Sequence, residues 1–156
     1  MPTTTLANPT TIMNDFSDIS FVESKEFYWS AKENTVHYNS SEFKSIRGTY
    51  RLIHEIGHAL CNHKNYVSGV GLLALETEAW SKASEIAKKY GLVIDTNYIE
   101  SCLDSYRDWL HHRSSCPDCT SISVESSENE YKCFNCLRKW TVSGNQLSRC
   151  YRQTLV

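Results

Sequence analysis

The strongest chemical signal in the sequence is His54-Glu55-Ile56-Gly57-His58. Its two histidines are four residues apart, so on a helix both rings project from nearly one face and can hold one zinc ion at about 2.0–2.1 Å. Glu55 lies beside them, where its carboxylate can take a proton from zinc-bound water. The motif predicts a catalytic zinc site with His54 and His58 as ligands and Glu55 as general base.

An ordinary amphipathic helix is the alternative interpretation of these five residues. Apolar residues surround the motif, namely Ile53, Ile56, Ala59 and Leu60. Two imidazoles and a carboxylate in such buried surroundings cost free energy unless they have a partner. A metal ion removes that cost, so the context favours a metal site.

A catalytic zinc ion usually takes three protein ligands, and the third must come from downstream. Glu76 and Glu78 are the candidates. At helical spacing Glu78 shares a face with the charged residues Lys82, Glu85 and Lys89. Glu76 aligns with the apolar residues Trp80, Ala83 and Ala87. This pattern favours Glu76 and leaves Glu78 open. If both glutamates face solvent, His63 is the fallback ligand.

Two Cys-x-x-Cys pairs near the C-terminus form a second signal. Their four cysteines can close a tetrahedral thiolate site, because thirteen residues between the pairs let the chain reverse: Cys116, Cys119, Cys133 and Cys136. Such a closed shell leaves no position for substrate, so we expect a structural zinc ion in a module that resembles a zinc ribbon. The other three cysteines, Cys61, Cys102 and Cys150, are expected to be packing or idle thiols.

The elements that must position these residues follow from hydrophobic spacing. Aromatic and β-branched residues on either side of residues 30–35 predict a β-hairpin within 16–38. Apolar periodicity predicts helices over about 40–63, 72–90 and 96–111. We therefore expect an α+β protein in which helices carrying His-Glu-x-x-His pack against a small antiparallel sheet.

Composition divides the chain into three parts. Residues 1–15 are rich in Thr, Asn and Pro and are expected to be a flexible segment without a fold of its own. Residues 16–113 are expected to form the domain that carries His-Glu-x-x-His, and residues 114–156 the zinc-ribbon-like module. Residues 107–156 hold seven Lys/Arg against five Asp/Glu, which permits a protein or nucleic-acid contact through the ribbon without establishing one. The residues for such a contact are Arg113, Lys132, Arg138, Lys139 and Trp140.

The N-terminal residues contain neither a basic stretch nor an apolar one of the kind found in signal peptides. No later segment approaches the roughly 18 consecutive apolar residues that span a bilayer. We expect a cytoplasmic protein without membrane contact, in which paired cysteines bind metal instead of forming disulfides.

The strings HEIGHALCNH and ETEAWSKA together resemble the ImmA/IrrE-type zinc peptidases over about residues 25–90. The resemblance implies a zincin-like, gluzincin-type metallopeptidase with His54, His58 and Glu76 on zinc and Glu55 activating water. It also implies that a protein or peptide substrate lies along the hairpin edge. Trp80 and Lys82 depart from that family, which usually has Asn and Phe at these positions. The group that would stabilise the oxyanion stays open among His63, His37 and Tyr66.

The sequence thus predicts a zinc-dependent peptidase with two zinc ions per chain, one catalytic and one structural. Two alternatives remain. A SprT-like protease acting on DNA-associated proteins also joins His-Glu-x-x-His to a zinc ribbon, but that group takes its third ligand from a histidine, and His63 is too near while His111 and His112 are too far. The other alternative is a non-catalytic binding or adaptor protein stabilised by zinc.

Overall fold

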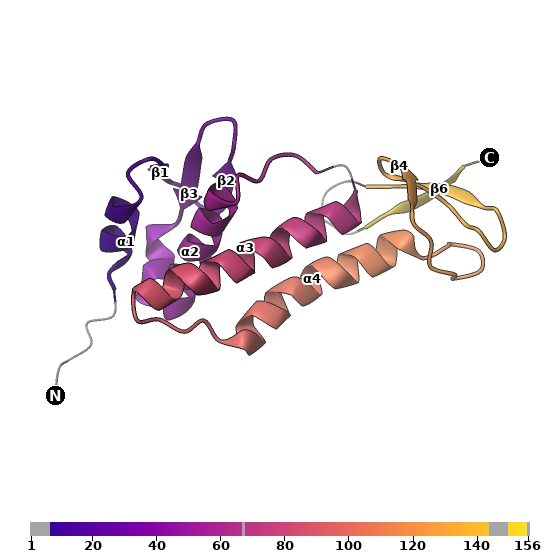
Figure 1. Cartoon of the computed structure of the whole chain (residues 1–156). Coiled ribbons are helices and arrows are strands. Elements are labelled where there is room, and N and C mark those ends of the chain that lie inside the picture. Colours follow the sequence, from indigo (N-terminus) through magenta and orange to yellow (C-terminus); the bar gives the residue numbers. More distant parts are fainter. Residues whose placement is uncertain (1–6, 67, 144–149, 156) are drawn as a thin grey trace. The chain divides into compact units, whose positions relative to one another are not determined.

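The computed structural model describes residues 7–66, 68–143 and 150–155, and the following statements concern these residues. The chain divides into two compact units, one comprising Met1–Asn65 with Leu75–Ile99 and the other Tyr66–Ala74 with Glu100–Val156. The fold is α+β, with four α-helices and two small sheets in the described ranges (Figure 1). None of the helices within those ranges is long and apolar enough to cross a membrane.

The N-terminal residues depart from the expectation of a segment without a fold. Helix α1 (Pro9–Asp15) is capped by the Asn8 side chain, which accepts the Thr10 backbone N–H, and Pro9 occupies its first turn. Ile12 is fully buried and so ties the helix to the first unit. Residues 1–6, the remainder of the predicted flexible segment, lie outside the described residues.

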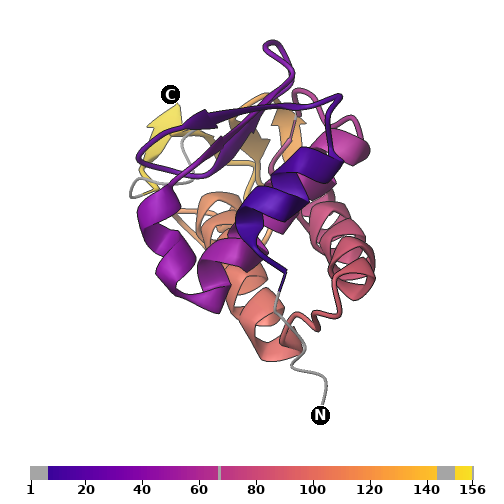
Figure 2. The same ribbon diagram turned by 90° about the vertical axis from the view of Figure 1, so that its left-hand side faces the viewer.

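The first sheet contains β1 (Ser20–Glu23), β2 (Tyr28–Ser30) and β3 (Thr35–Tyr38) in the order β1-β3-β2. The predicted hairpin is confirmed, since β2 and β3 pair antiparallel. The expectation of a purely antiparallel sheet is wrong, because β1 pairs parallel with β3. Figure 2 shows this sheet together with α1 and α2 of the same unit.

The predicted helix over 40–63 is two elements. A 3-10 helix, η1 (Ser40–Lys44), precedes α2 (Ile46–Leu60), and the break falls at Ser45. Ser45 has extended backbone, and its hydroxyl accepts the Arg47 backbone N–H, so it caps α2. Helix α2 contacts β2 and β3, and its apolar face, which includes Leu52, Ile53 and Ile56, is fully buried.

The other two predicted helices are confirmed with small shifts at their ends. Helix α3 (Gly69–Lys89) stops where Gly91 adopts φ +68°, a conformation that glycine takes without strain. Helix α4 (Thr96–Ser114) runs three residues beyond its predicted end. Both helices contribute residues to the two units.

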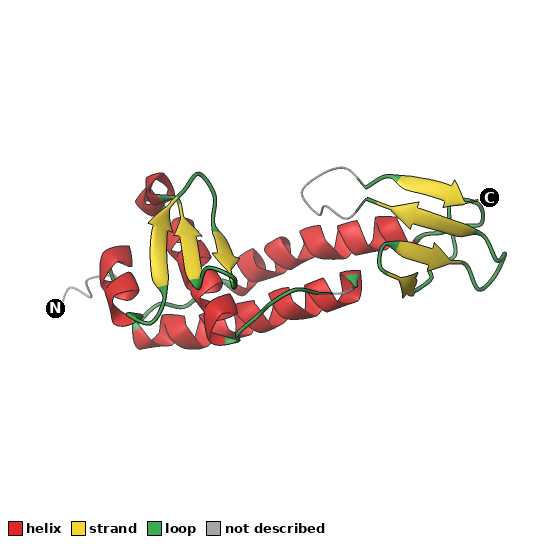
Figure 3. Ribbon diagram, turned by 90° about the horizontal axis from the view of Figure 1, so that it is seen from above, coloured by secondary structure: helices red, strands yellow, loops and turns green. Residues whose placement is uncertain are grey.

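The second sheet is antiparallel in the order β4-β5-β6-β7, with bounds Glu125–Ser127, Glu130–Lys132, Lys139–Val142 and Arg152–Leu155 (Figure 3). Its core is small and combines stacked aromatic rings with thiols (Tyr131, Trp140, Val142, Cys116 and Cys133, with Cys119 and Cys150 beside them). The expectation that Cys150 is a packing thiol is in line with its place in this core.

Arg113 and Trp140 are buried, contrary to the expectation that they could contact a partner. Arg113 is 2% exposed; its guanidinium lies over the Trp109 ring and contacts Asn129 at 2.6 Å and Glu125 at 3.3 Å. The Trp140 indole N–H donates to the Arg113 carbonyl at 2.9 Å. Of the five residues expected to meet a partner, only Lys132, Arg138 and Lys139 are exposed.

Candidate metal centres

The two motif histidines and Glu76 converge in the first unit. Helix α2 carries His54 and His58, and α3 carries Glu76. The carboxylate reaches both rings with different oxygens, Oε2 to His54 Nε2 and Oε1 to His58 Nε2, each at 3.0 Å. The two Nε2 atoms are 3.1 Å apart. Three potential ligand atoms therefore face one point, and Glu78, the other sequence candidate, is not among them.

These separations fit one ion. Ligands held at 2.0–2.1 Å in a tetrahedral arrangement lie about 3.3 Å from one another, close to the distances found between these nitrogens and oxygens. All three side chains are buried, with exposed fractions of 6 to 8%. If the Nε2 atoms of His54 and His58 are both unprotonated, their lone pairs repel each other at this distance. A cation bound by the two nitrogens and the carboxylate removes that repulsion.

Glycine at position 57 allows the two helices to come close enough for this convergence. A Cβ added to Gly57 would lie 2.6 Å from the Ala79 carbonyl oxygen, far inside van der Waals contact. The backbones of α2 and α3 therefore touch where Gly57, one residue before His58, meets Ala79, three residues after Glu76. The glycine of the motif has a packing role that the sequence analysis did not identify.

Trp80 supports the first histidine of the motif. Its ring stacks on His54 with centroids 4.1 Å apart, and Tyr98 packs edge-on against the same indole. His54 Nδ1 is buried and has no hydrogen-bond partner among the described residues, so stacking takes the place of the usual hydrogen bond to a ligating ring. Trp80 therefore lies directly against the candidate site.

The carboxylates of Glu55 and Glu76 have pKa values shifted in opposite directions. Burial raises the pKa of Glu76, but hydrogen bonds from His54 and His58 outweigh it and lower the pKa to about 2. Burial is also the largest influence on Glu55 and raises its pKa, opposed by the two histidines and by a hydrogen bond from the Trp29 backbone. Glu76 is therefore a fixed anion suited to ligation, and Glu55 a carboxylate of raised basicity suited to proton transfer.

A second group of donors lies at the C-terminal end of α2. Asn62 adopts φ +55°, its N–H bonds to the Ala59 carbonyl, and the His63 N–H bonds to the His58 carbonyl. This is a Schellman turn, and it folds His63 back onto the helix. His63 Nδ1 then lies 2.8 Å from His58 Nδ1, and His63 Nε2 lies 2.9 Å from Glu78 Oε2. His63, the fallback ligand, therefore contacts the Nδ1 side of His58 and is not a member of the group of His54, His58 and Glu76.

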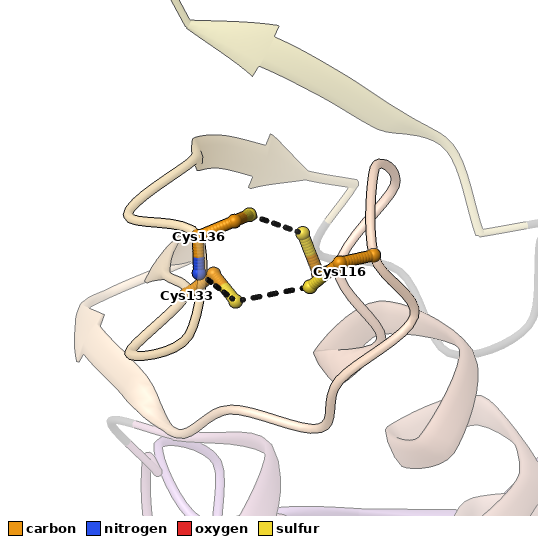
Figure 4. Close-up of side chains that lie close together, drawn as sticks. Cys116, Cys133 and Cys136 are labelled. Atoms are coloured by element: carbon orange, nitrogen blue, oxygen red, sulfur yellow. Dashed lines mark hydrogen bonds between the residues drawn. The ribbon is translucent and has the colours of Figure 1, made fainter.

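The four paired cysteines come together in the second unit. Cys116 Sγ lies 3.5 Å from Cys136 Sγ, and Cys119 Sγ lies 3.5 Å from Cys133 Sγ. Figure 4 shows the sulfurs of Cys116, Cys133 and Cys136 turned toward a common space. Tetrahedral thiolates at about 2.3 Å from zinc lie about 3.8 Å apart, so these distances fit an ion and exceed any disulfide.

The two cysteine loops have the same backbone design. In each, the residue after the second cysteine has positive φ, Thr120 at 63° and Leu137 at 68°. Its N–H bonds to the carbonyl of the first cysteine in both loops. Hydrogen bonds with Ser121 and Asn135 lower the pKa of Cys119 to about 5, which favours the thiolate that metals bind.

Comparisons with protein-family models, curated proteins and solved structures find no significant match for this chain. The assignment of both groups as metal centres therefore rests on their geometry. Donor atoms of His54, His58 and Glu76, and those of the four cysteines, lie within 4.8 Å of one another in each group.

The remaining sequence candidates are not members of these donor groups. His37 stacks on Tyr28 and contacts Glu33, so its ring is engaged on the hairpin. Tyr66 belongs to the other unit, as do His111 and His112. The group that would stabilise an oxyanion stays without an assignment. Cys61, expected to be a packing or idle thiol, lies beside His63 and Glu78. This proximity depends on the turn at Asn62 and has no signature in residue spacing.

Proposed function

We propose that this chain is a zinc-dependent peptidase of the zincin type, acting on a peptide bond of a protein or peptide substrate. The observation that carries the proposal is the convergence of His54 Nε2, His58 Nε2 and the Glu76 carboxylate within 3.1 Å, with the motif glutamate next to them on α2. Two imidazoles and one carboxylate are the ligand set of hydrolytic zinc sites that keep one position open.

Zinc bound there would polarise the substrate carbonyl and make water more acidic. Glu55 would accept the proton from that water, and its raised pKa matches the role. It would then return the proton to the departing amine. Against the effect of burial, hydrogen bonds from the two histidines lower the pKa of Glu76, so its carboxylate is already ionised before an ion binds.

The substrate would lie along β2. This strand is an edge of the first sheet, and the backbone N–H of Trp29 in its middle donates to Glu55. A peptide added antiparallel or parallel to such an edge gains main-chain hydrogen bonds and passes the carboxylate that handles protons. We therefore propose an extended peptide segment, not a folded surface, as the species that is cleaved.

The ligand set also supports the ImmA/IrrE-like assignment over the SprT-like one. The third donor next to the histidine pair is a carboxylate, whereas the SprT-like group supplies a histidine. The four-cysteine group would hold the structural zinc ion of the second unit, since its closed shell leaves no place for substrate.

Hydrolysis by zinc-loaded protein on a degenerate peptide library tests the proposal, with new termini read by mass spectrometry. The parent should generate termini, and Glu55→Gln should generate none while holding the same amount of zinc. His54→Ala/Glu76→Ala should lose one zinc ion relative to the parent. If Glu55→Gln yields the same products at the same rate as the parent, the peptidase proposal is wrong.

A further inference from the structure

Three side chains of different chemistry meet at the end of α2 outside the candidate catalytic site. Cys61 is the C-cap of the helix, His63 follows it by two residues, and Glu78 comes from α3. One ligand atom from each, a thiol sulfur, an imidazole nitrogen and a carboxylate oxygen, lies within 4.8 Å of the others. None of the three belongs to the group of His54, His58 and Glu76.

The backbone fixes these donors before any ion arrives. The left-handed residue Asn62 separates Cys61 from His63 and turns the chain, so that both side chains reach Glu78. The Trp29 indole N–H donates to the His63 carbonyl at 3.0 Å and anchors the turn to β2. Since His63 Nδ1 is occupied by His58, its Nε2 is the atom left for a ligand, and that atom points at Glu78.

The group is both held and accessible. His63 is 6% exposed, which keeps its ring in one orientation, whereas the Glu78 side chain is 62% exposed and Cys61 is partly exposed. An ion can therefore enter from solvent without unfolding the helix. Thiolate, imidazole and carboxylate are together the ligand types that zinc accepts, and three of them leave one tetrahedral position for water.

We propose that Cys61, His63 and Glu78 form an additional zinc-binding site, distinct from the candidate catalytic centre and from the four-cysteine centre. It goes beyond the proposed peptidase function, because it shares no ligand with that site. The chain then binds three zinc ions at saturation, one of them at a partly exposed position with a single sulfur ligand.

Cadmium-113 NMR on the full-length protein tests this assignment, since the shift of each bound ion reports its number of sulfur ligands. Saturated parent protein should give three resonances, corresponding to four, one and zero sulfur ligands. Cys61→Ser should remove the one-sulfur resonance and keep the other two. Cys102→Ser, which changes a partly exposed thiol on α4, is the matched control and should keep all three.

A second pair of variants separates ligation from structural damage. Glu78→Gln should reduce the number of ions counted by elemental analysis from three to two, whereas Glu85→Gln, an exposed glutamate of the same helix, should leave three. The four-sulfur resonance reports folding of the second unit in every sample. A saturated parent without a one-sulfur resonance, or a one-sulfur resonance that survives Cys61→Ser, would overturn the proposal. Loss of the zero-sulfur resonance alone bears on the peptidase proposal and leaves this one standing.

Discussion

His58 and His63 meet through their Nδ1 atoms at 2.8 Å, and this contact needs a proton on one ring only. If His58 Nε2 binds zinc, its Nδ1 carries the proton and donates to His63 Nδ1. While no ion is bound at Cys61, His63 and Glu78, the proton of His63 sits on Nε2 and is donated to Glu78 at 2.9 Å. An ion bound to Nε2 displaces this proton. A chain of hydrogen bonds therefore connects the candidate zinc ligand to an exposed carboxylate, and His63 is a positioning residue for His58.

The first prediction concerns that positioning role. His63→Phe should keep an aromatic ring in the buried space but remove the acceptor of the His58 N–H. Because such partners typically change metal affinity by about 10–100-fold, zinc affinity of the His54/His58/Glu76 site should fall by that amount. Competition with a chelator measures it. His37→Phe, on the hairpin, is the control and should match the parent; equal affinity in both variants would refute the role of His63.

The second prediction concerns the helix contact at Gly57. Gly57→Ala raises helix propensity by about 1 kcal/mol, but its methyl group would lie 2.6 Å from the Ala79 carbonyl oxygen, and overpacking of this kind costs about 1–3 kcal/mol. The helices must separate, so Glu76 should move away from the histidines and the site should lose zinc first. Elemental analysis at limiting zinc measures this, with the four-cysteine ion as internal reference. Unchanged zinc content and thermal stability would contradict it.

The third prediction uses the left-handed residue in the first cysteine loop. Thr120 has φ +63°, which costs a β-branched residue about 1–2 kcal/mol, and glycine adopts it without that strain. Glycine also loses more backbone entropy on folding, so Thr120→Gly should raise the free energy of unfolding of the zinc-loaded protein by only about 0.5–1 kcal/mol. Thermal unfolding measures it. The neighbouring change Ser121→Gly has no strain to relieve and should lower stability; a loss of stability in both variants would count against the explanation.

The fourth prediction is a pH dependence in the second unit. Burial, followed by the negative charge of Glu125, raises the pKa of Tyr131 to about 12, and its hydroxyl donates to Glu125 at 3.1 Å. Because the folded pKa lies above the ordinary value near 10, the neutral phenol stabilises the fold below about pH 10, and this contribution disappears as pH rises from 10 to 12. Tyrosinate absorbance is measured against pH in both proteins. Tyr131→Phe should lack one tyrosine that ionises above pH 10 in the parent. If the tyrosine lost in Tyr131→Phe is one that ionises near pH 10 in the parent, the raised pKa of Tyr131 is wrong.

Residue type and spacing were enough to predict the histidine pair, the four-cysteine group, the hairpin and three of the helices. The apolar pattern of residues along α3 also favoured Glu76 over Glu78 without excluding Glu78, because helical periodicity records which face is apolar. The sequence could not predict what depends on single backbone choices. Ser45 ends a 3-10 helix by capping the next one, and Asn62 turns the chain left-handed, which alone brings Cys61 to His63 and Glu78.

Tertiary contacts also overturned expectations based on charge. Arg113 reads as a solvated cation in sequence, yet aromatic and carboxylate partners bury it. The parallel strand β1 had no local signal either, since pairing between distant segments leaves no trace in the spacing of apolar residues. In both cases the decisive partner is remote along the chain, so local patterns carry no information about it.

The contact between Trp140 and the carbonyl of Arg113 determines where a transferable segment containing the four-cysteine group must begin. Trp140, in the core beside the cysteines, bonds to the last turn of α4, and the Arg113 side chain pairs with Glu125 of β4. A gene fusion or engineered fragment that begins where the composition changes, at residue 114, would leave both partners behind. The portable module starts within α4, and recombination that preserves its metal site must carry that part of the helix with it.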